Sequence, residues 1–405
     1  MNAMIFLINI AAVGLALAAL ALTAFVTLEV VFSLLGARNR AGSGNRPDRI
    51  AVIVPAHNET SVIDRSLASF KMQLTDNDQL IVVADNCTDN TAQIARAAGA
   101  DVLERNNADR RGKGFALQHA LDHLKSSPPD VVIFLDADCI LGGDVLRRIA
   151  DLAVTHQRPV QATYLLTATK AASVTTRISA FAWMFMNKVR MRGLDRLSDT
   201  SRITGSGFAL PWPIAKNINV ASGEVVEDLA LTFSMTEKGS APIFASDVFV
   251  YSEVPDDVEE RIRQSARWEH GSQALARKLV SSSLWHAVVS RNFSLFALAV
   301  DLAVPPMVRL AMLVLVANTI AVLTFFVTGA FAPLGLSLLA AILMGMNVLA
   351  AWAVYGRDIL SFSDLFMIDG FFRLKRRVYG ADAKRSARVW SPTRERSGVH
   401  DEHNE

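Results

Sequence analysis

Two aspartates that stand one residue apart, Asp136 and Asp138, are the side chains in this sequence best suited to hold a metal ion. They follow residues 131–135, five apolar residues that predict a strand buried on both faces of a mostly parallel sheet. Ligands of open α/β sheets bind at the carboxyl ends of the strands. The sequence shows no obvious cationic partner beside the two carboxylates, so they repel one another unless a cation lies between them. A hard divalent cation that also binds substrate phosphates is the expected ligand, although aspartate is equally common where a strand ends in a polar turn.

Polar side chains also follow two other predicted strands. Asn58 and Glu59 come after a strand at residues 50–55, and Asp85 ends a strand at residues 80–85. Such residues along one edge of a sheet are typical of a nucleotide crevice. A Rossmann dehydrogenase with Asp85 on a ribose is the main rival, but the first turn reads Pro-Ala-His-Asn-Glu and lacks the glycine fingerprint that admits a pyrophosphate.

Three further groups of residues could take part in the chemistry. Lys113 lies between two glycines, which let a backbone approach a phosphate while the lysine supplies charge; a solvated basic loop is the competing interpretation. Glu227 and Asp228 open an apolar helix, where acidic residues are also ordinary partners of the helix dipole. Farther along the chain stand Gln264 and Arg267-Trp268.

Strands that alternate with helices must position these residues. This alternation predicts βαβ units and an α/β domain with a parallel sheet. A helix at residues 178–191, rich in aromatic residues and methionine, fits either core packing or contact with a membrane surface. The predicted strands lie at residues 50–55, 80–85, 101–104, 131–135 and 160–167, and the predicted helices end near residue 70 or cover residues 91–98, 115–124, 143–155 and 229–235.

The composition indicates a membrane protein with a sizeable soluble part. Of the 405 residues, 51% are hydrophobic and 20% are charged, and the net charge of +2 gives no reason to expect a nucleic acid partner. The two cysteines, Cys87 and Cys139, form neither a disulfide framework nor a metal-ligand spacing, which favours a reducing, cytoplasmic setting.

Three apolar segments, at residues 4–36, 308–328 and 331–355, each exceed the roughly 20 residues that span a bilayer. Four arginines follow the first segment within a short distance and place that flank in the cytoplasm, with the N-terminus outside. Glycine and serine at residues 41–47 predict a flexible linker there. Residues 281–304 and 362–372 are expected to form interfacial helices. The arginines are Arg38, Arg40, Arg46 and Arg49, and the basic C-terminal tail contains Arg373, Lys375, Arg376, Arg377, Lys384, Arg385 and Arg388.

In their order along the chain, these motifs resemble a membrane-bound family 2 glycosyltransferase. The resemblance covers roughly residues 48–273, and its last motif is similar to the Gln-x-x-Arg-Trp pattern of the cellulose, chitin and hyaluronan synthase group. The motifs are Pro-Ala-His-Asn-Glu, Asp85, Gly112-Lys113-Gly114, Asp136-Ala137-Asp138, Gly205-Ser206-Gly207, Glu227-Asp228, and Gln264 with Arg267-Trp268.

The resemblance implies a GT-A fold that binds a nucleotide-diphosphate sugar, usually a UDP-sugar. Asp136 and Asp138 would hold Mg²⁺ or Mn²⁺ on the diphosphate, and Asp228 would be the general base with Glu227 beside it. In the donor site, Asp85 would contact the base and Lys113 the nucleotide portion, with Pro55, His57 and Glu59 nearby; Gln264, Arg267 and Trp268 would cap the diphosphate and line the acceptor site.

The chemistry of transfer agrees with these roles. An inverting transfer needs one carboxylate within reach of the acceptor hydroxyl to take its proton. The departing nucleotide diphosphate gains negative charge, which a divalent cation, Arg267 and Lys113 would stabilise.

We therefore expect an inverting transferase at the inner face of the cytoplasmic membrane. It would add a sugar to a lipid-linked or polysaccharide acceptor in exopolysaccharide or envelope-glycan assembly, among membrane lipids and other assembly or export proteins. The expected parts are a membrane helix and linker (residues 1–46), a GT-A domain (47–280) and a membrane-associated part with a basic tail (281–405). The alternatives are a glycolipid synthase of the ceramide-glucosyltransferase type and a catalytically silent membrane scaffold.

Overall fold

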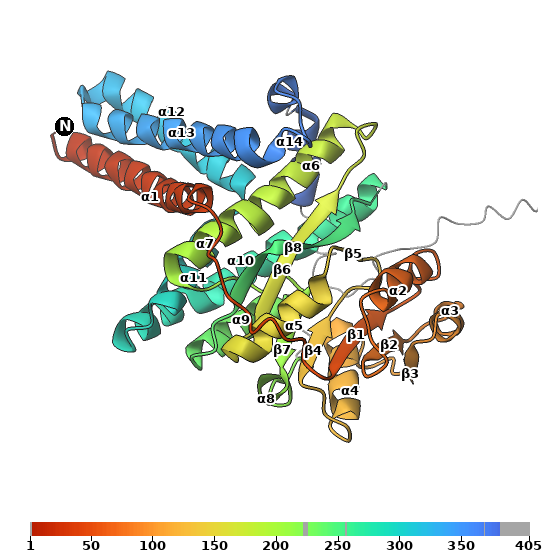
Figure 1. The fold of residues 1–405 in the computed structure, drawn as a ribbon. Coiled ribbons are helices and arrows are strands. Elements are labelled where there is room, and N and C mark those ends of the chain that lie inside the picture. Colours follow the sequence, from red (N-terminus) through yellow and green to blue (C-terminus); the bar gives the residue numbers. More distant parts are fainter. Residues whose placement is uncertain (1, 222–225, 256, 368, 381–405) are drawn as a thin grey trace, which may run out of the picture.

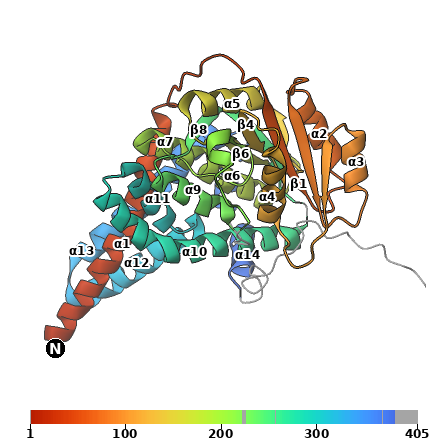
Figure 2. The ribbon, with the colours of Figure 1, turned by 90° about the horizontal axis from the view of Figure 1, so that it is seen from below.

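The computed structural model describes residues 2–221, 226–255, 257–367 and 369–380. A central α/β domain is preceded by helix α1 (Asn2–Leu34) and followed by helices α12 (Met307–Thr328) and α13 (Phe331–Ala351). These three helices lie side by side and project from the domain (Figures 1 and 2). Of the predicted features, the start of the acidic segment at Glu224 and the distal tail with Lys384, Arg385 and Arg388 lie outside the described residues.

Within the described residues, eight strands form one mixed sheet in the order β3-β2-β1-β4-β7-β6-β8-β5. The first four strands in this order are mutually parallel, as predicted, and β6 and β8 are also parallel. Strand β7 runs antiparallel to both β4 and β6, and the short β5 runs antiparallel to β8. The strands are β1 (Ile50–Ala56), β2 (Gln79–Asp85), β3 (Asp101–Arg105), β4 (Val131–Phe134), β5 (Ile140–Gly142), β6 (Val160–Thr167), β7 (Phe208–Pro211) and β8 (Ile243–Glu253).

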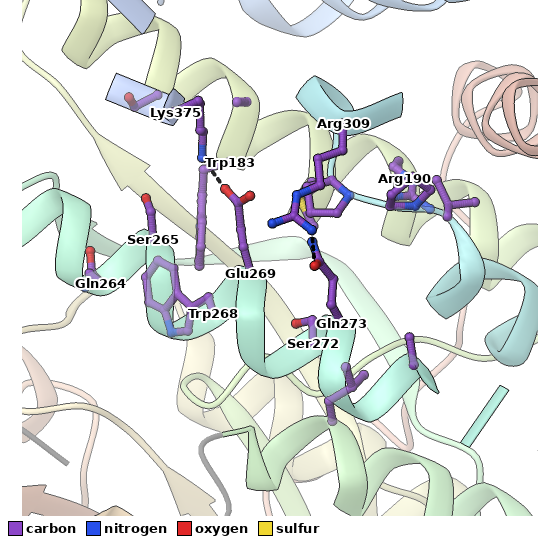
Figure 3. Close-up of a pocket in the computed structure, with 18 of the residues that line it drawn as sticks. Trp183, Arg190, Gln264, Ser265, Trp268, Glu269, Ser272, Gln273, Arg309 and Lys375 are labelled. Carbon is purple, nitrogen blue, oxygen red and sulfur yellow. Dashed lines mark hydrogen bonds and ion pairs between the residues drawn. The ribbon is translucent and has the colours of Figure 1, made fainter. Parts of the chain in front are cut away.

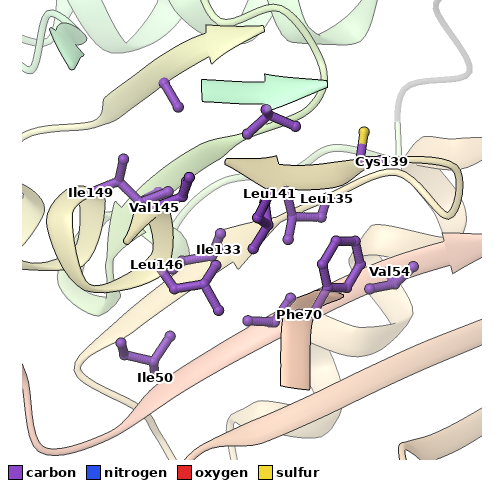
Figure 4. Packing of buried hydrophobic residues seen from close by; sticks show 14 of the residues in the cluster. Ile50, Val54, Phe70, Ile133, Leu135, Cys139, Leu141, Val145, Leu146 and Ile149 are labelled. Carbon is purple, nitrogen blue, oxygen red and sulfur yellow. The ribbon is translucent and has the colours of Figure 1, made fainter. Parts of the chain in front are cut away.

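Both faces of the sheet are covered by helices, because successive side chains of a strand point to opposite faces. Ile50, Val52 and Val54 pack on one face with helices α2, α3 and α5, and part of this cluster is drawn in Figure 4. Ala51 and Ile53 pack on the other face with helices α4, α8 and α9. These helices are α2 (Ile63–Lys71), α3 (Thr91–Ala97), α4 (Lys113–Leu124), α5 (Val145–His156), α8 (Trp212–Ala215) and α9 (Glu227–Glu237).

One long helical segment connects the sheet to the apolar helices. It consists of α6 (Val174–Met184), a π-helical stretch η1 (Phe185–Arg190) and α7 (Met191–Ser198). Phe181 and Phe185 are buried in a cluster that also contains Val26 and Val30 of α1. The aromatic helix predicted at residues 178–191 therefore serves core packing between the domain and α1.

The backbones of α7 and α1 meet at Gly193. A Cβ atom added to Gly193 would lie 1.8 Å from the backbone oxygen of Glu29, so any side chain would push the two helices apart. Glu29 itself is fully buried although it belongs to an apolar helix. The contact joins α1 to the α/β domain at a defined position.

The predicted flexible linker after α1 is in fact bound to the surface of α5, which corrects the expectation from its composition. The Asp151 carboxylate accepts hydrogen bonds from the backbone N–H groups of Ser43 and Gly44 and from the Ser43 hydroxyl. Arg40, expected only as a basic flank of a membrane helix, forms ion pairs with Asp195 and Asp199.

Among the described residues, three helices are long and apolar enough to cross a membrane. They pack on one another through small residues, such as Ala19 of α1, Ala317 of α12 and Ala340 of α13. Polar bonds also join them: the Asn347 side chain of α13 donates to the Thr27 hydroxyl of α1 over 3.0 Å, and Thr328 of α12 donates to the Asn9 side chain of α1 over 2.9 Å.

The expected interfacial helices have different boundaries from those predicted. Residues 281–304 are divided between the end of α10 (Val258–Val289) and α11 (Phe293–Ala303). The division occurs where Arg291 adopts a positive φ of 53° and the Asn292 side chain caps α11. Residues 362–372 fall into the short helix η3 (Ser363–Phe366) and the start of α14 (Asp369–Val378), while a further π-helical turn, η2 (Trp352–Gly356), extends α13.

Candidate active site

Asp136 follows the carboxyl end of β4 and forms an ion pair with Lys113 at the start of α4. The expectation that the two aspartates have no cationic partner is therefore wrong for Asp136, because the loop before α4 brings a lysine from 23 residues away. Burial lowers the pKa of Lys113, but Asp136, together with Glu227 and Asp228, raises it more, and the net shift is upward. Lys113 consequently stays protonated beside the carboxylate.

Asp138 lies beside Asp136, and the ligand atoms of Asp136, Asp138 and Cys139 all lie within 4.8 Å of one another. This spacing suits a metal ion. Burial first, and then the negative charges of Asp138 and Asp136, raise the pKa of the Cys139 thiol well above its usual range. A protonated, buried thiol is a poor ligand, so the two carboxylates favour a hard cation such as Mg²⁺ or Mn²⁺.

The loop before β7 holds this acidic pair from the opposite side. The backbone oxygen of Gly205 accepts a hydrogen bond from Lys113 Nζ over 2.7 Å, and the Ser206 hydroxyl accepts one from the backbone N–H of Asp136 over 2.9 Å. Gly205 has a φ of +82°, and a Cβ there would lie 3.2 Å from an Asp228 carboxylate oxygen. Glycine at position 205 thus allows Asp228 and Lys113 to approach the same point.

Glu227 and Asp228 form the first turn of α9 next to this loop. Burial, followed by the negative charge of Asp228, raises the pKa of Glu227 to about 7. Burial also raises the pKa of Asp228, although Lys113 opposes the shift. Two carboxyl groups with raised pKa values are suited to accept a proton near neutral pH.

The residues of the predicted Gln-x-x-Arg-Trp motif lie in the first half of α10 and point in two directions. Gln264 and Trp268, one helical turn apart, line a cavity that is described below. Arg267 is close enough to the acids for Asp136, Glu227 and Asp228 to oppose the effect of burial, which on balance lowers its pKa. Arg267 has no hydrogen bond or ion pair within the described part of the chain, so its guanidinium remains available for an anion.

The expected nucleoside-binding residues lie at the ends of β1 and β2. Asp85 is buried and bound to Arg105, whose Nη1 lies 2.5 Å from the carboxylate. His57 Nδ1 lies 2.7 Å from the backbone oxygen of Asp85, which connects the two strand ends. Pro55 pairs in register with β2, and the backbone N–H of Glu59 donates to Thr91 on α3.

A cavity of about 460 Å³, here called the junction cavity, lies between the α/β domain and the apolar helices (Figure 3). Its wall is mostly apolar. Trp183 of α6 and Trp268 of α10 form part of it, with their ring centroids 4.5 Å apart. Residues from β6, α6, η1, α10, α14 and the connection between α11 and α12 complete the wall.

Several residues of the site were not predicted from the sequence. Arg105 binds Asp85, Ser252 donates a hydrogen bond to Asp138 over 2.7 Å, and Ser206 orients Asp136. Ser206 stood inside a glycine-rich motif and could have been singled out. Arg105 lies one residue beyond the strand predicted at residues 101–104, and Ser252 belongs to a strand that was not predicted. Only the pairing of β3 with β2 and of β8 with β5 brings the two residues to the site.

Comparison with known proteins gives the family. The family described as "Glycosyltransferase like family 2" matches residues 47–271, more than half of the chain. The chain is 25% identical over 279 residues to "Probable glucomannan 4-beta-mannosyltransferase 2" of Oryza sativa subsp. japonica, covering 61% of this chain and 44% of that protein. It is 38% identical over 98 residues to glucosyl-3-phosphoglycerate synthase of Mycobacterium tuberculosis, covering 22% of this chain and 29% of the relative.

The chain thus spans less than half the length of these two curated relatives. Among solved structures, it is similar in fold to the mannosyltransferase PcManGT from Pyrobaculum calidifontis, which was solved in complex with GDP-Man and Mn²⁺. The TM-score is 0.54 at 17% sequence identity, and the match covers 86% of this chain and 98% of the other. The chain belongs to the glycosyltransferase like family 2, and its α/β domain has the GT-A fold.

Proposed function

We propose that this family 2 glycosyltransferase is an inverting enzyme that transfers a sugar from a nucleotide-diphosphate sugar to a lipid-linked or polysaccharide acceptor at a membrane. The observation that carries the proposal is the meeting of Lys113, Asp136 and Asp228 around Gly205. Cationic and acidic groups on this small area can serve the two ends of the reaction, the departing diphosphate and the attacking hydroxyl.

The donor side is formed by the strand ends and α10. Asp136 and Asp138 would hold Mg²⁺ or Mn²⁺, which when bound supplies positive charge to the diphosphate oxygens. Lys113 and the unpaired Arg267 add positive charge. This charge stabilises the diphosphate more strongly as the bond to the sugar breaks and negative charge develops on the diphosphate. Asp85, held by Arg105, would recognise the base of the nucleotide sugar.

The acceptor side is formed by the start of α9. Asp228 is the proposed general base: its raised pKa makes the carboxylate a stronger proton acceptor than an ordinary aspartate. Glu227 adjoins it, and the negative charge of Asp228 contributes to the raised pKa of Glu227. Trp268 offers a flat apolar face in the wall of the junction cavity.

The relatives indicate the class of the donor sugar but not which sugar it is. The names of two relatives refer to mannosyl and glucosyl transfer, so a hexose is the expected donor sugar. With its basic flank at Arg38 and Arg40, α1 would place its N-terminus outside and the GT-A domain in the cytoplasm, where nucleotide sugars are made. Assembly of an exopolysaccharide or envelope glycan is the process that this arrangement fits.

The test is donor turnover by the full chain. The detergent-purified protein is mixed with a membrane lipid extract and with each of a panel of UDP- and GDP-sugars, and the release of the nucleotide diphosphate is followed. We expect release from one hexose donor and inversion at the anomeric carbon of the product. An Asp136→Asn variant is the matched blank, and release at the level of this blank from every donor would refute the proposal.

A further inference from the structure

The junction cavity touches both the segment that follows the proposed base and the first turn of an apolar helix. Its wall contains Leu229, the residue after Asp228, and also Pro306 and Arg309 at the start of α12. A molecule bound in this cavity beside α12 would therefore lie close to the segment that carries the proposed base.

The walls of this cavity suit a hydrocarbon chain. Leu302 comes from the end of α11, Phe371 and Leu374 come from α14, and Met186 comes from η1. Trp183 of α6 and Trp268 of α10 both line the same cavity (Figure 3). Apolar and aromatic walls with a few polar groups are typical of sites for small amphiphilic ligands.

The charges around the cavity favour an anion. Six cationic side chains and only two acidic ones, Glu269 and Asp301, belong to its lining. Both acids are engaged, Glu269 by Lys375 and Asp301 by Arg190 (Figure 3 shows the former pair).

Arg309 differs from the cations that are bound to acids. Its guanidinium donates to the neutral side-chain oxygen of Gln273 and lies 4.2 Å from the ring centroid of Tyr379. No ion pair between Arg309 and a carboxylate occurs within the described residues. A half-buried arginine with only neutral partners is well suited to form charge-assisted hydrogen bonds with a phosphate or carboxylate.

We propose that the junction cavity binds the acceptor and that this acceptor is an anionic membrane lipid, with its chain among the apolar walls and its acidic group on Arg309. The inference rests on the proposed function and narrows its acceptor to a lipid that enters sideways from the bilayer. The acidic group is a phosphate or a carboxylate, and the binding test below distinguishes a lipid with a phosphate from a lipid with a carboxylate.

The binding test uses the full chain in phosphatidylcholine vesicles that contain one of three photoreactive probes: phosphatidic acid, a fatty acid or a fatty alcohol. Mass spectrometry then locates the labelled peptides. We expect at least one acidic probe to label α10 and α14, and the neutral alcohol to label them far less. Preference for phosphatidic acid or for the fatty acid identifies the acidic group. Arg309→Gln should weaken labelling by the preferred acid about tenfold, the effect of losing a charged hydrogen bond.

The transfer test fills the cavity without touching the donor site. Ser272 lines the cavity from α10, so Ser272→Phe should abolish transfer of labelled sugar into lipid-extractable product while nucleotide diphosphate still binds. The control, Ser281→Phe, places the same side chain at an exposed position of the same helix and should change neither property. Arg376→Gln, an exposed cation of α14 outside the cavity lining, is the control for Arg309→Gln.

Two results would overturn the inference, and they have different meanings. If Ser272→Phe transfers sugar at the wild-type rate, or if the neutral probe labels the cavity as strongly as both acids, the cavity is not an anionic-lipid site and the proposed function still stands. If the wild-type protein neither binds nor releases any nucleotide diphosphate, the proposed function itself fails, and this inference fails with it.

Discussion

Arg190 donates a hydrogen bond from Nε to Oε2 of Glu29 over 2.5 Å, and so links the α/β domain to the first apolar helix. The same guanidinium reaches Asp301 of α11 through Nη2 over 2.6 Å. Arg190 is 2% exposed and Glu29 is fully buried. One cation therefore holds three segments that are remote in sequence.

Removal of this cation should be costly. Arg190→Met would leave two buried carboxylates facing each other, and breaking a buried pair typically lowers stability by about 3–5 kcal/mol. We expect a clear fall in the midpoint of thermal unfolding in detergent, followed by near-ultraviolet circular dichroism. Arg65→Ala, which removes an exposed ion pair with Glu253, should change the midpoint little. Equal midpoints for the two variants would mean that Arg190 is not a structural tie.

Transfer should depend on a divalent cation. Excess EDTA should abolish nucleotide release, and Mn²⁺ or Mg²⁺ should restore it, because two adjacent carboxylates favour a hard divalent cation. Asp138→Asn should weaken the binding of metal and donor together, measured by titration calorimetry. Asp144→Asn, at an exposed ion pair with Arg147, serves as the control. Full activity in excess EDTA would exclude the metal role.

The base prediction can be tested without disturbing the donor. Asp228→Asn keeps the shape of the side chain but cannot accept a proton, so turnover should fall by about 10²–10⁴-fold. Donor binding should persist, since the lysine and the strand-end aspartates remain. Asp247→Asn, an exposed acid of β8 paired with Arg148, is the control. A rate within a few-fold of wild type would point to Glu227 as the base instead.

The acid limb of the pH–rate profile should lie above the range of an ordinary aspartate. Burial raises the pKa of Asp228, and burial with the charge of Asp228 raises the pKa of Glu227 to about 7. A base acts in its deprotonated form, so kcat/KM should fall as the pH drops through the raised pKa of Asp228. Glu227→Gln removes a negative charge beside Asp228 and should move the limb to lower pH. Glu237→Gln, at the far end of α9, should leave the limb in place, and an unmoved limb in Glu227→Gln would show that the neighbouring charge does not set it.

Local sequence pattern predicted the first half of the fold closely. The strand at Ile50 and the strand ending at Asp85 agree with the structure within one residue at either end, because buried apolar runs and polar strand ends are local signals. The parallel sheet was also predicted for these strands, since each βαβ unit can be identified from the alternation of its elements. The antiparallel insertion of β7 between β4 and β6 was not predicted, because strand pairing depends on distant segments.

The same distinction applies to the site. The two strand-end aspartates could be recognised from their spacing alone, but the ion pair of Lys113 with Asp136 and the arginine that holds Asp85 could not. The linker is a sharper case: its glycine and serine content predicted flexibility, yet the single Asp151 carboxylate, 108 residues from Ser43, fixes it to α5. Composition indicates how flexible a segment is when it is isolated. It does not indicate which hydrogen-bond acceptor on a distant element will bind the segment in the folded protein.

The contact at Gly193 has a consequence for the geometry of the whole molecule. With the backbones of α7 and α1 touching there, the domain cannot pivot on its first helix as it would on a loose tether. Wherever α1 lies in a bilayer, the proposed catalytic carboxylates then stand at one height and one tilt relative to the lipid surface. A larger residue at position 193 would change this height, and with it the distance between the lipid surface and the site.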